Sequence, residues 1–178
     1  MSAVPNRIEL RLRDLAQLFN LMDPSPFYER DLDAAAEEFI VGWAQELPRE
    51  AELVLVIHLA TAPQPDRAAG IEEAVRHYFA NRAEIKGREL RQLLRRGRVS
   101  LVIGIAFLAA CFGLGVLASR LFSGPWVGFI DVGLQIAGWV AMWRPLEIFL
   151  YDWWPIRNER RLLERLAGMP VKLVVPPA

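Results

Sequence analysis

The sequence has one cysteine, Cys111, and two histidines, His58 and His77, among its 178 residues. A single cysteine excludes an intrachain disulfide and a cysteine-based metal site. The two histidines lack metal-ligand spacing, so we interpret both as structural side chains. The chain also has no GxSxG, P-loop, GxGxxG or HExxH motif. We therefore expect no enzyme, no metal site and no cofactor.

Charged residues are missing from one long stretch, residues 99–119. A helix of about 20 apolar residues crosses a hydrocarbon core of about 30 Å. A second apolar run, residues 125–154, follows after a link of only a few residues, which permits nothing but an antiparallel return. The sequence therefore predicts a transmembrane helical hairpin over residues 99–154.

The start of the chain lacks the apolar segment of a cleavable signal peptide, so we expect the first membrane run to act as the insertion signal. The net charge is zero, yet residues 1–66 carry −7 and residues 67–178 carry +7. This basic excess beside the hairpin suits anionic lipid headgroups, and no motif indicates nucleic acid.

Basic residues flank both apolar runs, with seven in residues 82–98 and four in residues 157–165. The link between the two runs has only Arg120 beside it. Because positively charged flanks stay in the cytoplasm, both termini are expected there, with the link outside.

Three short strands are predicted outside the hairpin. Residues 6–14 alternate between apolar and charged side chains, residues 51–60 form a nearly uncharged run that suits a buried central strand, and residues 171–175 suit a final strand. Three strands bury little surface, so we expect a partner subunit or the membrane surface to add stability. The expected fold is an α+β membrane protein in which the hairpin is inserted into a small cytoplasmic α/β domain.

Helical patterns separate these strands. Residues 33–47 predict a helix with Asp31 or Asp33 as its N-cap. A loop is predicted over residues 61–70, and a helical pattern then runs from Ile71 to about Leu121, with residues 95–98 as the favoured place for a kink. A basic amphipathic helix is predicted over residues 156–168. The apolar stripe of the first helix is predicted to be Phe39, Ile40, Trp43 and Leu47.

These elements divide the chain into three regions. Residues 1–98 form a cytoplasmic α/β region with a long basic helix, residues 99–154 form the hairpin, and residues 155–178 return to the cytoplasm.

Asp131 is the most informative polar residue, because an acid inside a spanning segment is costly. Gln135 follows on the same helical face. One interpretation is a proton or ion relay, or a polar contact between subunits. The interpretation that we favour is an ion pair with Arg120 across the hairpin.

Arg144 and Glu147 lie near the inner end of the second run, three residues apart and separated by Pro145. They suit an ion pair on one helical face, either as part of a hinge or as an anchor at the membrane interface, which we favour. In the first run, Ala109 and Gly113 form a small-xxx-small pair that suits close packing against the second helix or another copy.

The segment DPSPFYERDLDAAAEEFIVGWAQELP and the segment YDWWPIRNERRLLERLAGMPV that follows the hairpin together resemble small bacterial inner-membrane proteins with a two-helix transmembrane hairpin. The resemblance covers most of the chain and implies a bacterial inner membrane. It carries over no activity and no functional residues.

The function expected from these features is a non-enzymatic scaffold, assembly or regulatory subunit that forms a homo-oligomer. Its partner-binding surface would include Glu29, Asp31 and Asp33 on the cytoplasmic side. One alternative is a small oligomeric channel or transporter component that uses Asp131 and Gln135. A second alternative is a membrane-surface enzyme with a polar pocket beside His58 and Asp66.

Overall fold

The computed structural model describes residues 6–26, 30–61 and 65–175. The chain divides into two compact units. The first, here called the α/β unit, comprises Met1–Lys86 and Asn158–Ala178, and the second, the hairpin unit, comprises Gly87–Arg157.

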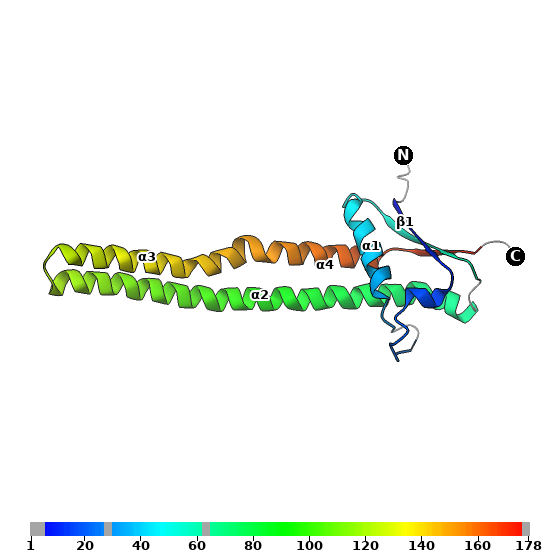
Figure 1. The fold of residues 1–178 in the computed structure, drawn as a ribbon, viewed down its shortest axis with the longest axis horizontal. Helices are drawn as coiled ribbons and strands as arrows, with labels where there is room; N and C mark the ends of the chain where they lie inside the picture. The colour runs from blue at the N-terminus through cyan, green and yellow to red at the C-terminus, as the bar shows by residue number, and fades with distance from the viewer. Residues whose placement is uncertain (1–5, 27–29, 62–64, 176–178) are drawn as a thin grey trace. The chain divides into compact units, whose positions relative to one another are not determined.

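The α/β unit contains a sheet of three parallel strands, β1 (Asn6–Leu12), β2 (Leu53–Leu59) and β3 (Val171–Val174), in the order β1-β2-β3 (Figure 1). The prediction of three strands with residues 51–60 at the centre is confirmed. β2 is apolar along nearly its whole length because a central parallel strand is shielded on both sides. Parallel strands need crossover connections, and the second crossover, from β2 to β3, includes the entire hairpin unit.

Helix α1 (Ala34–Glu46) begins after Asp33, whose side chain accepts a hydrogen bond of 3.0 Å from the Ala35 backbone N–H. Of the two predicted caps, Asp33 is therefore the N-cap. Before α1, a single 3-10 turn, η1 (Leu15–Leu18), follows β1.

The buried face of α1 differs from the prediction. Ala36, Ile40 and Ala44 lie in the core, one turn apart, whereas Phe39 and Trp43 are 39% and 47% exposed. The prediction of an aromatic stripe was wrong at these two positions, because alanines let the helix approach the sheet closely and leave the large rings at the rim.

Helix α2 (Pro65–Leu121) begins earlier than predicted. The expected loop over residues 61–70 is wrong from Pro65 onward, because proline suits the first turn of a helix, where its missing N–H has no intrahelical partner. α2 remains helical through residues 95–98, the segment in which we expected any kink to occur. The predicted end near Leu121 is confirmed.

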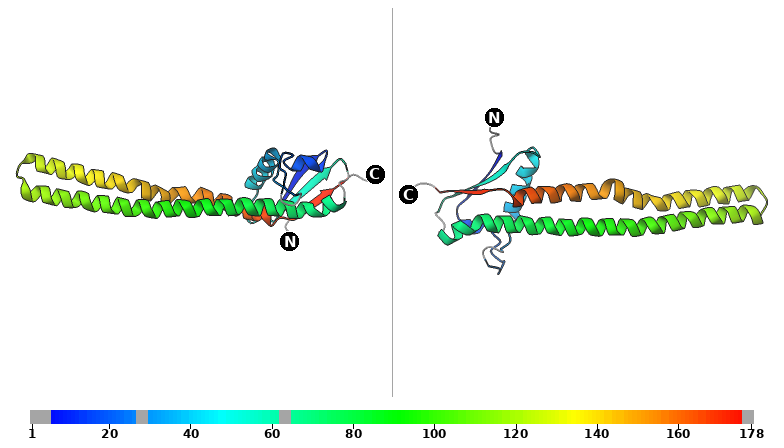
Figure 2. Two further views of the ribbon diagram at one scale, coloured as in Figure 1. Left: turned by 90° about the horizontal axis from the view of Figure 1, so that it is seen from below. Right: turned by 180° about the vertical axis from the view of Figure 1, so that it is seen from behind.

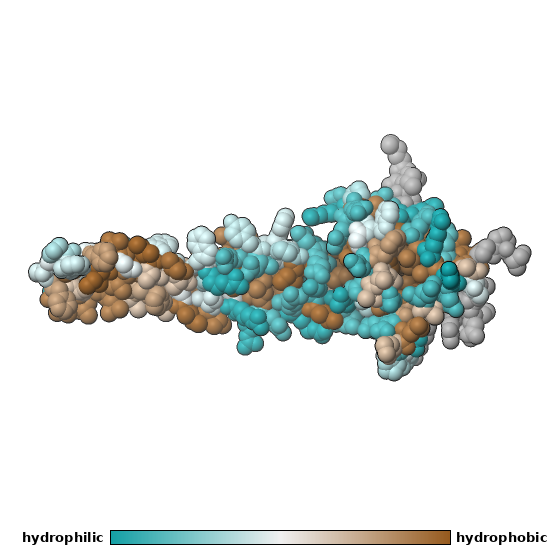
Figure 3. Space-filling view, in the orientation of Figure 1, coloured by the Kyte–Doolittle hydropathy of each residue, from teal (hydrophilic) through white to brown (hydrophobic). Residues whose placement is uncertain are grey.

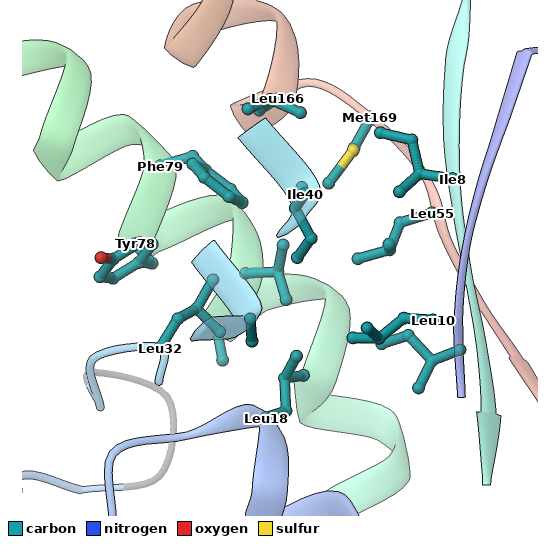
Figure 4. Close-up of a cluster of buried hydrophobic side chains, with 14 of the residues drawn as sticks. Ile8, Leu10, Leu18, Leu32, Ile40, Leu55, Tyr78, Phe79, Leu166 and Met169 are labelled. Carbon is teal, nitrogen blue, oxygen red and sulfur yellow. The ribbon is translucent and has the colours of Figure 1, made fainter. Parts of the chain in front are cut away.

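The core of the α/β unit lies between one face of the sheet and the helices α1, α2 and α4 (Trp153–Ala167). Figure 4 shows Ile40, Phe79 and Leu166 from the three helices pointing toward Ile8 and Leu55 from the strands, and all five are fully buried. The predicted amphipathic helix near the C-terminus therefore supplies part of the core.

In the hairpin unit, α3 (Pro125–Glu147) runs antiparallel beside α2 in both views of Figure 2. The return occurs at Gly124, whose φ of +148° favours glycine. A π-helical segment, η3 (Ile148–Asp152), then follows α3. Three residues earlier Pro145 lies inside α3, and a proline deprives a helix of one backbone hydrogen bond.

Candidate functional site in the apolar hairpin

The hairpin exposes an unusually apolar surface. The structure has two helices that are long and apolar enough to cross a membrane, and only 17% and 6% of their most apolar windows are buried. Figure 3 shows these apolar residues covering the end of the hairpin at which α2 is joined to α3. Contiguous exposed apolar patches of this kind mark surfaces that contact another protein, a ligand or a membrane.

Glycines allow the two helices to pack closely inside the hairpin unit. A Cβ atom added to Gly138 of α3 would lie 2.6 Å from Leu108 Cδ1, and one added to Gly115 of α2 would meet the Asp131 side chain. Gly113, in contrast, has no atom within 4 Å of such a Cβ, and its predicted partner Ala109 is exposed. The small-xxx-small pair thus faces away from the contact between α2 and α3.

Asp131 lies in the notch that Gly115 creates, and its Oδ2 accepts a hydrogen bond of 2.9 Å from Gln135 Nε2. The pairing of Asp131 with Gln135 follows from their spacing of four residues, which places them on one helical face. Arg120 is exposed and, in the described part of the chain, forms no ion pair with Asp131. The Asp131 carboxylate therefore has a hydrogen-bond partner within α3 and lies against the backbone of α2 at Gly115.

A second cluster of polar side chains lies at the C-terminal end of α3 and in the segment that follows it. Arg144 Nη1 lies 3.0 Å from Glu147 Oε2 and 3.2 Å from Asp152 Oδ2, and Trp143 Nε1 donates to Glu147 Oε1 at 2.9 Å. This cluster includes the predicted contact between Arg144 and Glu147. The Arg144 side chain is exposed and contacts both carboxylates. This arrangement suits a residue at the boundary between apolar and aqueous surroundings.

A basic surface precedes the uncharged part of α2. A shallow hollow of about 490 Å³ follows one face of the helix, where guanidinium groups give way to aliphatic side chains. Its lining residues are Gln92, Arg95, Arg96, Val99, Ser100 and Ile103. The change from charged to apolar within about three turns matches the boundary between lipid headgroups and hydrocarbon.

The acidic residues predicted to bind a partner lie before and at the start of α1. Asp33 caps the helix, and Asp31 is exposed, with its backbone N–H donating to Asp23 Oδ2 at 2.8 Å. This hydrogen bond and that from the Ser25 N–H lower the pKa of Asp23. Glu29 lies outside the described residues. Asp31 and Asp33 therefore belong to a short acidic surface, although Asp33 also has a structural role.

Another acid of this region, Glu37, has a role that sequence patterns did not indicate. Its carboxylate accepts a hydrogen bond of 2.7 Å from the Tyr78 hydroxyl and two from the Arg82 guanidinium. Burial raises the pKa of Tyr78, and the adjacent Glu37 raises it further. Burial is the largest single influence on Arg82 and lowers its pKa, but the hydrogen bonds and negative charge of Glu37, with smaller contributions from Tyr78 and Glu159, together raise the pKa overall. This cluster ties α1 to α2 within the α/β unit.

Neither histidine lies in a recognisable catalytic or metal-binding group. His58 Nε2 lies 3.7 Å from Glu9 Oε2 across the sheet, and His77 is exposed on α2. The side chain of Asp66 is not among those described. Among the described residues, no three His, Cys, Asp or Glu side chains group as a metal site.

The described structure therefore belongs to the class of α/β units that carry a long apolar helical hairpin, which here is inserted in the sequence between the second and third strands. No protein-family model, curated protein or solved structure matches this chain.

Proposed function

We propose that this chain is a non-enzymatic, multi-pass membrane protein whose α/β unit serves as a scaffold or regulatory subunit on the cytoplasmic side. The observation that carries the proposal is the apolar hairpin, whose exposed side chains have no cover in the described structure. A bilayer removes this surface from water, and helices can lie in hydrocarbon because they pair most of their backbone groups internally.

The membrane in question is the bacterial inner membrane, with both termini in the cytoplasm. The basic residues on α2 before Val99 and on α4 after Trp153 support this orientation, since positive flanks remain cytoplasmic. The carboxylate of Asp131 accepts a hydrogen bond from Gln135, which favours a structural role for Asp131 over a role in transport. A relay would need further ionisable groups along the hydrocarbon.

A topology experiment tests the membrane assignment. We expect the full chain to resist alkaline carbonate extraction from bacterial membranes and to require detergent for release. A reporter active only in the periplasm should be silent at the C-terminus and active when inserted between Phe122 and Gly124. A periplasmic C-terminus, or a water-soluble monomer without detergent, would contradict the proposal.

The acidic surface is proposed to bind a basic protein partner. Removing its charge with Glu29→Gln, Asp31→Asn and Asp33→Asn should weaken capture of that partner from detergent extracts several-fold, measured by quantitative mass spectrometry. Asparagine caps helices as well as aspartate does, so α1 should persist.

A matched control removes three exposed acids from the other end of α1 and the turn that follows it, with Glu46→Gln, Glu50→Gln and Glu52→Gln. This variant has the same net charge as the first and should retain capture. Equal loss in both variants would show a general charge effect, and equal retention would place the partner elsewhere.

A further inference from the structure

We propose that β1 pairs antiparallel with β1 of a second copy, centred on Leu10, so that two α/β units share one continuous six-stranded sheet. This names the surface and geometry of the self-association expected for the scaffold, and it rests on that part of the proposed function. The pairing lies within the α/β unit and does not depend on the hairpin.

The first argument is that, among the residues that the structure describes, no strand pairs with the outer edge of β1. Strand order places β1 and β3 at the two edges of the sheet. β3 has four residues and is followed in the sequence by Pro176 and Pro177, features that protect an edge from further pairing. β1 has seven residues and no proline, so it is the edge that remains open to another strand.

The direction of the backbone groups supports this pairing. The Leu12 carbonyl oxygen accepts a hydrogen bond of 3.0 Å from the Ala60 N–H, on the side of β2. Because the peptide groups of successive residues in a strand point to alternate sides, those of Arg7, Glu9 and Arg11 point toward the free edge. These three residues therefore supply the donors and acceptors for a second strand.

Charge then selects the register. If the dyad passed through Glu9, Glu9 would oppose its own copy and Arg7 would oppose the partner's Arg11, which is destabilising. If it passes through Leu10, Glu9 opposes the partner's Arg11 twice. In that register Glu9 and Arg11 form hydrogen-bonded pairs, because both point toward the free edge.

The other face of the strand selects the same register. With the dyad at Leu10, Leu10 meets its own copy and Ile8 meets the partner's Leu12, so that only apolar side chains meet on the core side. With the dyad at Ile8, the charges on the outer face would also match, but Asn6 would oppose the partner's Leu10. Over residues 8–12, where both strands lie within β1, the register centred on Leu10 is therefore complementary on both faces.

The exposed aromatic residues of α1 lie beside this edge. Phe39 and Trp43, whose ring centroids are 6.1 Å apart, line a hollow of about 560 Å³ together with Leu10 and the outward-pointing residues of β1. A dyad perpendicular to the sheet keeps both copies of α1 on the same face. The aromatic pairs of the two copies then meet beneath the joined strands, which explains why large apolar rings lie at the rim.

Charge exchange tests the pairing in the full chain in detergent. Glu9→Arg places arginine opposite arginine, and Arg11→Glu places glutamate opposite glutamate, so each variant should dissociate about tenfold more readily or more. The double variant, Glu9→Arg with Arg11→Glu, should recover the dimer. An equimolar mixture of the two single variants should form heterodimers, because positions 9 and 11 of one variant then oppose residues of opposite charge in the other. Dimer fractions are measured by native mass spectrometry with differently tagged chains, and circular dichroism checks that each variant is folded.

Recovery in the double variant and in the mixture supports the proposal, since a general folding defect would not be reversed by exchanging charges. A monomeric wild-type chain in detergent would overturn it, while leaving the membrane assignment to the extraction experiment. A dimer that all variants retain would also overturn it, by placing self-association on another surface. Weakening without recovery would also overturn the proposed register, because the loss would then not come from the pairing of Glu9 with Arg11 of the second copy.

Discussion

Arginine at two exposed positions of α2 should remove the protein from the membrane. Phe107 and Leu114 lie in the uncharged stretch, 47% and 54% exposed, two turns apart. On insertion scales, an arginine near the centre of a spanning helix costs about 2.5–3.5 kcal/mol, so Phe107→Arg with Leu114→Arg should cost about 5–7 kcal/mol. We expect the double variant to lose most of its resistance to carbonate extraction, measured by immunoblotting of the pellet and supernatant.

A control places an arginine on the same helix outside the uncharged stretch. Gln92 is exposed and lies among basic residues, so Gln92→Arg should leave extraction unchanged. The reason is that an arginine there remains at the headgroups, as its neighbours do. If the double variant stayed as firmly bound as the control, the exposed apolar face of α2 would not be in contact with lipid, and the membrane assignment would be wrong.

Strands and long helices were predictable because each depends on a local pattern. β1 follows from the alternation of apolar and charged side chains, and β2 follows from a run of apolar residues that only a central strand or a spanning helix accommodates. The paired apolar runs likewise indicated two long apolar helices, which the structure contains. These features require no knowledge of which residues meet in space.

Features that depend on packing were not predictable in this way. The predicted apolar stripe of α1 included Phe39 and Trp43 because of their helical spacing, whereas close contact with the sheet selects Ala36 and Ala44. The start of α2 at Pro65 was missed because proline suits both a loop and a first helical turn. In each case, two readings of the same residue were compatible with the sequence, and tertiary contacts decided between them.

The polar sites show the same division. The spacing of Asp131 and Gln135 placed them on one face, but the contact with Gly115 depends on the register of α3 against α2. Glu37 lies more than 40 positions before Tyr78 and Arg82 along the chain, and no local signal links it to them. The weak signal available was an acid in the first turn of one helix, with a tyrosine and an arginine four residues apart on another.

Truncation of Phe79 should destabilise the α/β unit more than any single change at its surface. Phe79 is fully buried between α2 and the sheet, and its ring packs edge-on against Tyr78, with centroids 5.4 Å apart. Phe79→Ala removes this contact and leaves a cavity, which typically costs about 3–5 kcal/mol. Hydrogen exchange of the β2 amides, measured by mass spectrometry on the detergent-solubilised chain, reports the loss as faster exchange in the segment from Leu53 to Leu59.

Phe39→Ala is the matched control, because it removes the same side chain from a position that is 39% exposed. In the monomeric α/β unit this change should cost well below half as much, since the ring is only partly removed from water and the site can refill with solvent. Within the dimer proposed above, Phe39→Ala should instead weaken association while the exchange of β2 within each monomer changes little. Equal acceleration of β2 exchange in the two variants would mean that Phe79 does not lie in the stabilising core, and a loss below about 1 kcal/mol for Phe79→Ala would lead to the same conclusion.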